Sequence, residues 1–487
     1  MIDTEALRKK VIDLAIQGKL TEQLPEDGNA EDLYAQIQEK KEKLIKEGKI
    51  KKQKPLPEIE EDEIPFEIPK NWKWVRLSSI YEINPKVEAD DNMDAAFIPM
   101  DKISPGFAKA FSFVKQKWGV ASKNHTRFQN DDVAFAKISP CFENRKSFVA
   151  KALPNGIGGG TTELIVLRQK SIFPEYTYYV VSSQRFIDRC SMSYKGIVGQ
   201  QRIKSMYVNS FLVPLPPFEE QIRIAGLINT VFEQIDIIDE LQAKYNNDVE
   251  VLKSKVIDAA TRGELTEQLP EDGNAEDLYN QIQEEKEKLI KEGKIKKQKQ
   301  LPDIEKDEIP FEIPSNWKWV RLADVSNIIN GDRGKNYPAK STLSHEGIPF
   351  ISALNLNGKD IDDDERLLCL NDEQYNKLRS GKLHKGDIVI CIRGSLGKHG
   401  KYPYDIGAIA SSLVICRSYC YGSVMGDYIM TWLDSSLFPR EIHKYDGGAA
   451  QPNLAADNLK KFLIPIPTLN EQQRIANKLD MLIEYMK

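Results

Sequence analysis

Cysteine and histidine are scarce in this sequence, and long hydrophobic runs are missing. Six cysteines and five histidines are spread over 487 residues, which argues against a disulfide scaffold and against a histidine-based catalytic triad. No apolar run approaches the roughly 18–20 residues that a membrane-spanning helix requires. The N-terminal segment carries acidic residues and no apolar core, so we expect no signal peptide. These absences favour a reducing, cytoplasmic setting.

Motifs for metal, nucleotide or methyl-transfer chemistry are also missing. Asn84-Pro85-Lys86 is not the Asn-Pro-Pro-aromatic element of amino-methyltransferases, and 338–342 lacks the glycines of a phosphate-binding loop. Cys416 and Cys420 have no second ligand pair at zinc spacing. The Gly158–Gly160 run is predicted to be a turn, because no strand–glycine–helix unit surrounds it. We therefore predict a non-catalytic chain that binds neither metal nor cofactor.

Charge is unevenly distributed along the chain. The net charge of −5 argues, taken alone, against a nucleic-acid partner. Residues 72–215, however, hold 20 basic and 12 acidic side chains, a net of +8, and residues 317–466 carry a net of +2. The rest of the chain therefore carries −15, which leaves the first of these blocks suited to a polyanion.

The chain is an internal duplication. Residues 19–77 recur at 264–322 with 7 differences in 59 positions. A second match pairs 214–224 with 465–475, and the blocks between these anchors diverge. This pattern predicts one scaffold that presents two different variable domains. The predicted parts are scaffold helix at 1–18, 216–262 and 467–487, helical linker segments at 19–71 and 263–316, and variable domains at 72–215 and 317–466.

The central scaffold segment has a heptad pattern. Apolar residues recur along 219–262 at alternating steps of four and three, with Gln242 as the polar exception, which predicts a coiled-coil helix roughly 66 Å long. A long core helix within one large domain is the alternative. The predicted seam positions are Ile224, Ile228, Val231, Ile235, Ile238, Tyr245, Val249, Leu252, Val256 and Ala259.

The two chain ends resemble the two halves of this central helix. The N-terminal run (Thr4, Leu7, Val11, Leu14) matches its second half, and the C-terminal run (Ile475, Leu479, Leu482, Met486) matches its first half. About nine positions, 237–245, have no counterpart in either end, and the C-terminal copy stops at Lys487. We expect head and tail to lie end to end, antiparallel to the central helix, in a pseudo-two-fold arrangement.

Shorter elements complete the scaffold. Helices are predicted at 30–47 and 275–292, each ended by a glycine, and their alternating Glu and Lys indicate solvated helices. The KIKKQK runs and the acidic, proline-rich stretches that follow are predicted to be extended linkers, although KIKKQK could also touch DNA phosphate. The tryptophans of the repeated Asn-Trp-Lys-Trp-Val-Arg-Leu segment (71–77 and 316–322) are predicted to pack rather than to stack on bases.

The variable domains mix strands and helices. Helical stretches are predicted at Pro174–Arg189 and Gly426–Ile442. The fold class is therefore α+β, with two α/β domains separated by a long antiparallel two-helix coiled coil. The predicted strands are Val133–Ala136, Leu164–Leu167 and Phe211–Val213 in the first domain, and Ile388–Ile392, Leu413–Cys416 and Phe462–Ile464 in the second.

Several segments of the variable domains resemble those of a known family. Residues 137–146 with 159–164, and residues 331–338 with 393–398, resemble two classes of target recognition domain in type I restriction–modification specificity subunits. The Pro-Leu-Pro-Pro exit at 214–217 is similar to the family's passage into its conserved helix. With the duplication, the resemblance covers nearly the whole chain. It implies a subunit that reads a two-part double-stranded DNA site, one half with each domain.

DNA readers need cations for phosphates and forked or amide side chains for base edges. Loops of both domains offer such residues. The predicted DNA contacts are Lys137, Arg145, Lys146, Lys195, Gln200, Gln201, Arg202 and Lys204 in the first domain, and Arg333, Lys335, Asn336, Arg393, Lys398, Gln451 and Asn453 in the second.

The resemblance also implies partners. We expect two methyltransferase subunits, which carry S-adenosylmethionine, and translocating restriction subunits, which use ATP and Mg²⁺, with no membrane involved. Two other readings of the sequence compete with this one. A coiled-coil adaptor with two protein-binding domains would lack the basic first domain, and a self-contained restriction–methylation enzyme would need the missing catalytic motifs.

Overall fold

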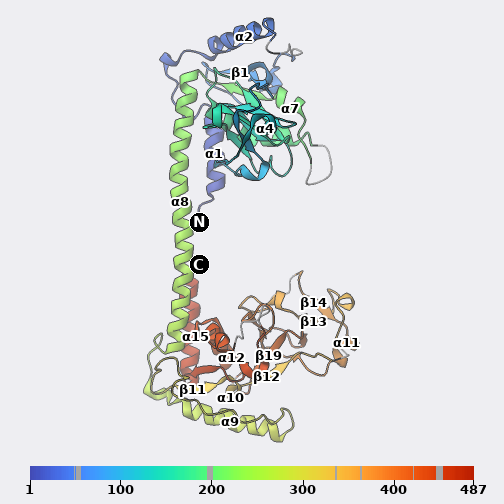
Figure 1. Ribbon diagram of the computed structural model, residues 1–487. Coiled ribbons are helices and arrows are strands. Elements are labelled where there is room, and N and C mark those ends of the chain that lie inside the picture. The colour runs from blue at the N-terminus through green and yellow to red at the C-terminus, as the bar shows by residue number, and fades with distance from the viewer. Residues whose placement is uncertain are drawn as a thin grey trace. The chain divides into compact units, whose positions relative to one another are not determined.

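The chain forms two compact units, Met1–Ala243 (unit 1) and Lys244–Lys487 (unit 2) (Figure 1). The computed structural model describes residues 1–48, 50, 56–194, 201–334, 337–361, 365–420, 422–445 and 453–486. Each unit holds one copy of the duplicated plan.

Unit 1 contains the first variable domain, the first linker segment and the N-terminal helix. Its helices are α1 (Thr4–Ile16), α2 (Ala30–Lys46), α3 (Leu77–Ile80), α4 (Trp118–Ala121), α5 (Pro174–Ser182), α6 (Gln184–Ser191), α7 (Ser205–Ser210) and the first part of α8 (Phe218–Arg262). Its strands are β1 (Lys73–Arg76), β2 (Glu82–Ile83), β3 (Asp94–Ile98), β4 (Val114–Lys117), β5 (Thr126–Gln129), β6 (Val133–Ala136), β7 (Ser147–Val149), β8 (Ile157–Gly160), β9 (Leu164–Arg168) and β10 (Leu212–Leu215).

Unit 2 repeats this order of elements. After the last part of α8, its helices are α9 (Ala275–Lys291), α10 (Leu322–Val325), α11 (Asp372–Lys377), α12 (Gly422–Asp434), α13 (Leu437–Lys444), α14 (Ala456–Leu459) and α15 (Leu469–Tyr485). Its strands are β11 (Lys318–Arg321), β12 (Ser326–Asn330), β13 (Ile348–Ile351), β14 (Leu368–Leu370), β15 (Lys382–Leu383), β16 (Ile388–Cys391), β17 (His399–Lys401), β18 (Gly407–Ile409), β19 (Leu413–Ser418) and β20 (Leu463–Ile466).

The two variable domains share one sheet topology although their sequences diverge. The first domain has sheets of order β2-β9-β6-β7 and β4-β3-β8-β5, and the second has β12-β19-β16-β17 and β14-β13-β18-β15. In each, a two-stranded pair (β1-β10 or β11-β20) joins the start of the domain to its end. The predicted α+β class with two α/β domains is confirmed.

The glycine run 158–160 is a strand, so the predicted turn is wrong. It forms most of β8, which pairs with β3 on one side and β5 on the other. A Cβ on Gly159 would lie 1.9 Å from the carbonyl oxygen of Ala121, and one on Gly158 would lie 2.4 Å from the Phe128 ring. Glycine is required here because neighbouring atoms approach the strand closely.

Each predicted domain helix is broken into two. The 174–189 stretch divides into α5 and α6 at Ser183, whose extended backbone lets its hydroxyl accept from the Phe186 amide at 3.2 Å. The 426–442 stretch likewise divides into α12 and α13. A serine that caps a new helix competes with continuation of the preceding one.

An ion pair with a buried carboxylate occupies the same place in both domains. Arg168 binds Asp132 at 2.6 Å, and Arg417 binds Asp387 at 2.6 Å. Each carboxylate also accepts from a backbone amide three residues earlier in the chain, that of Gln129 or that of His384. Buried charges need such pairing. The pair anchors β6 to β9 and β16 to β19 at one end, which fixes where the other ends of these strands lie.

Helix α1 packs antiparallel on the first part of α8 (Figure 1). The Thr4 hydroxyl donates to Asp239 at 2.5 Å near one end, and Thr21, just beyond the other end of α1, donates to Glu220 at 3.0 Å. The apolar contact combines Val11, Ile12, Ala15 and Ile16 with Ile224, Ile228, Phe232 and Ile235 in one core cluster.

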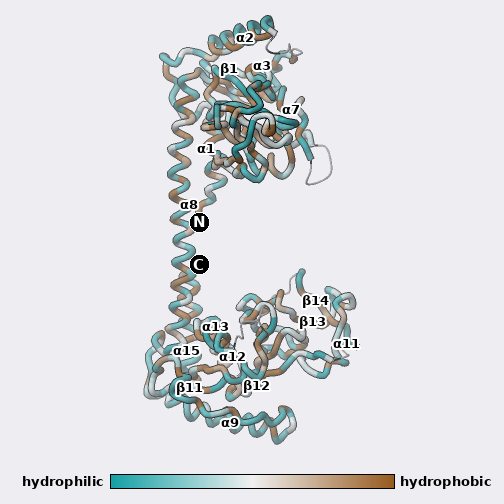
Figure 2. Tube along the Cα trace, in the orientation of Figure 1, coloured by the Kyte–Doolittle hydropathy of each residue, from teal (hydrophilic) through white to brown (hydrophobic). Residues whose placement is uncertain are grey.

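Helix α15 lies beside the last part of α8 within unit 2 (Figure 1). Val256 of α8 and Leu479 of α15 belong to the same apolar cluster. Figure 2 shows hydrophobic residues recurring between hydrophilic ones along α8, as an amphipathic helix requires. The expected end-to-end arrangement of head and tail concerns both units together and stays a prediction.

The predicted heptad seam is only partly correct. Ile224, Ile228 and Ile235 are buried, but Tyr245 and Leu252 are 57% and 47% exposed. Helices α1 and α15 have 13 and 17 residues, whereas α8 has 45. The described parts of the two shorter helices therefore cannot cover the whole length of α8.

Helices α2 and α9 are docked on the domains rather than fully solvated. The Lys41 ammonium donates to the Ser78 carbonyl at 2.8 Å, and Lys286, the equivalent residue in α9, donates to Ala323 at 2.9 Å. Burial lowers the pKa of both lysines. Gly48 and Gly293 end the two helices with φ of +71° and +70°, as predicted.

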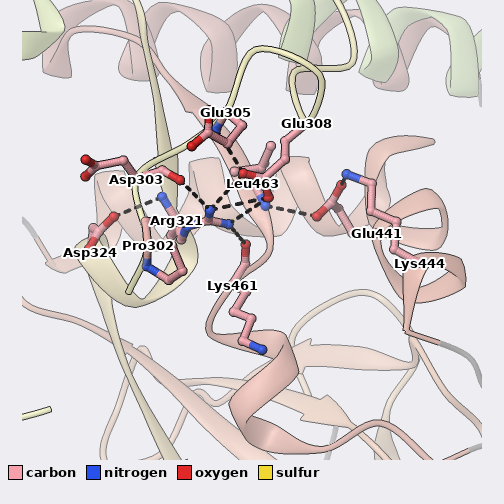
Figure 3. A network of polar contacts seen from close by, with 10 residues as sticks. All are labelled: Pro302, Asp303, Glu305, Glu308, Arg321, Asp324, Glu441, Lys444, Lys461 and Leu463. Atoms are coloured by element: carbon pink, nitrogen blue, oxygen red, sulfur yellow. Dashed lines mark hydrogen bonds and ion pairs between the residues drawn. The ribbon is translucent and has the colours of Figure 1, made fainter. Parts of the chain in front are cut away.

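The acidic, proline-rich linkers are held by buried arginines. Arg321, 4% exposed, donates to the carbonyls of Pro302 and Asp303 and pairs with Glu308 at 2.9 Å (Figure 3). Arg76 holds the first linker in the same way, through Glu63 at 2.7 Å. These linkers are therefore fixed to the domains. The KIKKQK run at 49–54 lies almost entirely outside the described residues.

Candidate DNA interface

Three segments of the first domain meet where strand β6 ends. The Lys137 amide donates to the Glu163 carbonyl at 2.8 Å, and the Ile203 amide donates to the Lys137 carbonyl at 3.0 Å. Ile138 and Arg202 face each other in an antiparallel bridge. We name residues 137–138, 163 and 202–203 junction 1.

The second domain builds the same arrangement at the end of β16. The Ile392 amide donates to the Ser412 carbonyl at 3.0 Å, and the Leu454 amide donates to the Ile392 carbonyl at 2.9 Å. Arg393 and Asn453 form the antiparallel bridge. We name residues 392–393, 412 and 453–454 junction 2.

The two junctions are equivalent by strand register. Ala136 pairs with Leu164 at the end of β6, and Cys391 pairs with Leu413 at the end of β16. Each junction starts one residue beyond that pair. Ile203 and Leu454, at matching positions, are 5% and 2% exposed and anchor the third segment in the domain interior. The backbone frame is therefore shared.

The side chains on this shared frame differ. In junction 1 the Arg202 guanidinium binds the Glu163 carboxylate through Nε at 2.9 Å and Nη2 at 2.8 Å. This pairing lowers the pKa of the Glu163 carboxyl. In junction 2 the position of Glu163 is taken by Ser412, and Arg393 Nε donates to the Asn453 side-chain oxygen at 3.2 Å.

Further predicted contacts lie next to the junctions. Lys146 and Lys398 occupy equivalent places, since their carbonyls accept from Ala136 and Cys391 at 2.9 and 2.7 Å. The Lys146 ammonium donates to the Met100 carbonyl at 2.9 Å, whereas Lys398 is exposed. Arg333 donates to the carbonyl of Ser411, beside junction 2, at 3.2 Å.

The structure thus brings together many of the predicted contacts. Lys137, Gln201, Arg202 and Lys204 are at or beside junction 1, and Arg333, Arg393, Lys398 and Asn453 are at or beside junction 2. Lys195, Gln200, Lys335, Asn336 and Gln451 lie outside the described residues.

Arg145 is placed differently from the other predicted contacts. It is 8% exposed, and its guanidinium donates to the Ser182 carbonyl at 3.0 Å and to Gln184. It also lies over the Phe107 ring, 5.0 Å from the centroid. Burial lowers its pKa. This position argues against a DNA contact and gives Arg145 a packing role.

Glu163 was not predicted as a site residue. DNA contacts are expected from cations and amides, whereas a carboxylate such as that of Glu163 would repel phosphate. The only signal in the sequence was its place in the Gly-Gly-Thr-Thr-Glu-Leu segment (159–164).

Neither metal ligands nor membrane spans are found among the described residues. No group of three His, Cys, Asp or Glu side chains there could hold a metal ion. Cys416 is buried, which raises the pKa of its thiol to about 12, and its sulfur lies 3.2 Å from the Ser326 hydroxyl. No described helix is both long enough and apolar enough to cross a bilayer.

Comparison with known proteins identifies the family. The sequence profile described as "Type I restriction modification DNA specificity domain" matches residues 69–247 and 314–486, more than half of the chain. The chain belongs to this family. Its two matches each include one variable domain and part of the scaffold. The type I restriction–modification specificity role that the resemblance implied is therefore confirmed, and the adaptor alternative is not favoured.

Individual members of the specificity-subunit family resemble this chain over nearly its full length. The type I restriction enzyme EcoEI specificity subunit of Escherichia coli is 36% identical, with 97% of this chain and 88% of the relative covered. The EcoAI specificity subunit, also of Escherichia coli, is 33% identical, with 98% and 88% covered.

A solved structure shares the fold. The HsdS subunit from Thermoanaerobacter tengcongensis is 20% identical with a TM-score of 0.52, and the match covers 87% of this chain and 91% of that one. At this identity the likeness supports the architecture alone.

Proposed function

We propose that this specificity subunit reads an asymmetric two-part DNA site, with one half read by each recognition domain (72–215 and 317–466). The observation that carries the proposal is the pair of junctions. Two domains of the same topology display different polar side chains at the same place. A shared frame with unlike side chains suits two readers of unlike base sequences.

The scaffold is suited to setting the distance between the two half-sites and to binding the partner subunits. Helix α8, 45 residues long, would span about 68 Å at 1.5 Å per residue, and we propose that it sets the gap between the half-sites. The near-identical segments 19–77 and 264–322 support two equivalent docking surfaces, one for each of two methyltransferase subunits.

Chemistry is assigned to the partners rather than to this chain. The methyltransferase subunits would supply S-adenosylmethionine and the restriction subunits ATP and Mg²⁺. The specificity subunit would bind double-stranded DNA and hold these partners on it, without catalysis or a cofactor of its own.

The first step of the test is to determine the DNA sequence that the complex recognises. Mapping methylated positions in DNA from cells that carry this chain and its partners would define both half-sites. The purified complex should then bind a duplex of that site at least about 10³-fold more tightly than a scrambled duplex at physiological salt. Equal affinity for both duplexes would contradict the proposal.

A further inference from the structure

Each junction contains one arginine, but the two arginines lie on different sides of the equivalent antiparallel bridges. Junction 1 carries Arg202 across the bridge from Ile138, and junction 2 carries Arg393 across from Asn453. By register, Arg202 takes the place of Asn453, and Arg393 the place of Ile138. The same local surface therefore presents a guanidinium from two different backbone positions, so the two readers are not copies of one recognition pattern.

Each of these guanidinium groups is held by a neighbouring side-chain oxygen. Glu163 binds Arg202 with two carboxylate oxygens, and Asn453 binds Arg393 with its amide oxygen at 3.2 Å. The Arg202 side chain is nevertheless 49% exposed, and Arg393 is also exposed. An arginine that is fixed and yet exposed loses less conformational entropy when it binds a ligand.

We propose that Arg202 and Arg393 each read a guanine in the major groove, and that Glu163 and Asn453 are positioning residues that aim them. The inference rests on the proposed function and names the base that each junction recognises. A guanidinium fork matches the O6 and N7 acceptors of guanine, and this pairing discriminates against the wrong base by about 5- to 150-fold.

Lys146 and Lys398, near the junctions, are better suited to binding phosphate than to reading bases. Lys146 and Lys398 carry compact point charges, which suit phosphate oxygens better than a two-acceptor base edge. The structure thus places an arginine held by a side-chain oxygen in each junction, and a lysine at an equivalent backbone position next to each junction. Base reading and phosphate binding should respond to different substitutions.

The experiment uses the full chain in complex with its methyltransferase partners. The probes are duplexes of the mapped site in which each guanine is replaced, one at a time, by 7-deazaguanine, which lacks the N7 acceptor. In the wild-type complex one such replacement in each half should weaken binding. In R202Q the sensitivity at one guanine should disappear, with binding weaker by about 5- to 150-fold, and the other half should be read as before.

R393Q is the matched variant. It should remove sensitivity at a guanine in the opposite half and leave the half affected by R202Q unchanged. Because each variant still has one intact reader, the unaffected half reports that the protein is folded and assembled.

The positioning role is tested with Glu163. E163Q keeps the size of the side chain and removes its charge, so discrimination at the guanine read by Arg202 should fall. E163D restores a carboxylate and should recover part of that discrimination. A merely structural role for Glu163 would alter thermal stability without this dependence on one base.

Two outcomes separate the inference from the function on which it rests. If R202Q weakens binding to every duplex equally and keeps the sensitivity to 7-deazaguanine, Arg202 contacts phosphate and the inference is overturned while the proposed function stands. If the wild-type complex does not distinguish the mapped site from a scrambled duplex, the proposed function fails as well.

Discussion

Trp72 donates its indole hydrogen to the buried carboxylate of Glu220 at 2.8 Å. Trp72 begins the first recognition domain, and Glu220 lies in the first turn of α8. The same carboxylate accepts from Thr21 and Gln23 of the linker. One side chain therefore joins the linker, the domain and the scaffold helix. The predicted packing role of the tryptophan is confirmed.

Removing this indole hydrogen should destabilise unit 1. W72F keeps one aromatic ring but removes the indole N–H and part of the buried ring volume. The lost bond to a charged group costs about 1.5–3 kcal/mol, and the lost packing adds to it. Trp317 makes the equivalent bond to Glu471 at 2.9 Å, so W317F is the matched variant in unit 2. Unfolding in urea, monitored by the hydrogen exchange of backbone amides in each unit, would show which unit is destabilised. Wild-type stability in both variants would contradict this account.

A pair of salt bridges should make the scaffold sensitive to acid. Arg223 binds the Asp27 carboxylate at 2.6 and 2.5 Å and lowers its pKa below the ordinary 3.8. A carboxyl with a depressed folded pKa stabilises the fold above its ordinary pKa, and this contribution is lost as the pH falls through the folded value. D27N should therefore lower the Tm at pH 7 and pH 5.

At pH 3 the Tm difference between D27N and the wild type should be smaller, because the carboxyl of the unfolded wild type then binds a proton. The Asp272–Arg474 pair is equivalent, and D272N should behave alike. Calorimetry at the three pH values measures the effect. A difference that stayed constant down to pH 3 would show that the ion pair is not its cause.

Much of the scaffold could be predicted because its signals are local. The asparagine before each of α2 and α9 and the glycine after it mark the helix ends within a few residues of sequence. The heptads of α8 likewise come from neighbouring turns. What the heptads could not show is how deeply each turn is packed, and Tyr245 and Leu252 are exposed although they fit the heptad pattern.

The unpredicted features depend on contacts between distant segments. Strand β8 looked like a turn because three glycines have no strand propensity, and only the closeness of Ala121 and Phe128 explains them. Glu163 and Arg202 are 39 residues apart in sequence, and they meet because the register of β6 with β9 and the bridge between Ile138 and Arg202 both bring them to the end of β6. Arg145 could not be distinguished from an exposed cation before its neighbours were known.

DNA binding should depend strongly on salt, with lysines and arginines acting differently. Each phosphate contact adds roughly −0.9 to the slope of log affinity against log salt. K146Q and K398Q should each weaken binding to the cognate and the scrambled duplex to a similar degree. Each should also reduce the steepness of log affinity against log salt by about 1. Titrations at several salt concentrations give both quantities. A lysine variant that lost discrimination but kept its slope would contradict the phosphate role.

Lengthening α8 should change the gap between the half-sites and not the bases read. One heptad inserted near Asn246 adds roughly 10 Å and keeps the helix faces in phase. A matching insertion at the start of α1 or at the end of α15, the head-and-tail junction, would keep the partner helix in register. Methylation mapping would show the preferred gap. An unchanged gap in a folded, active complex would show that α8 does not set the spacing.

The central claim is that two separate readers share one scaffold. Exchanging residues 72–215 for the corresponding domain of a related specificity subunit, and then mapping methylated sites in cells, tests it most directly. One half of the target should take the sequence read by the donor, and the other half should stay as it was. A change in both halves, or in neither while methylation continues, would contradict the account.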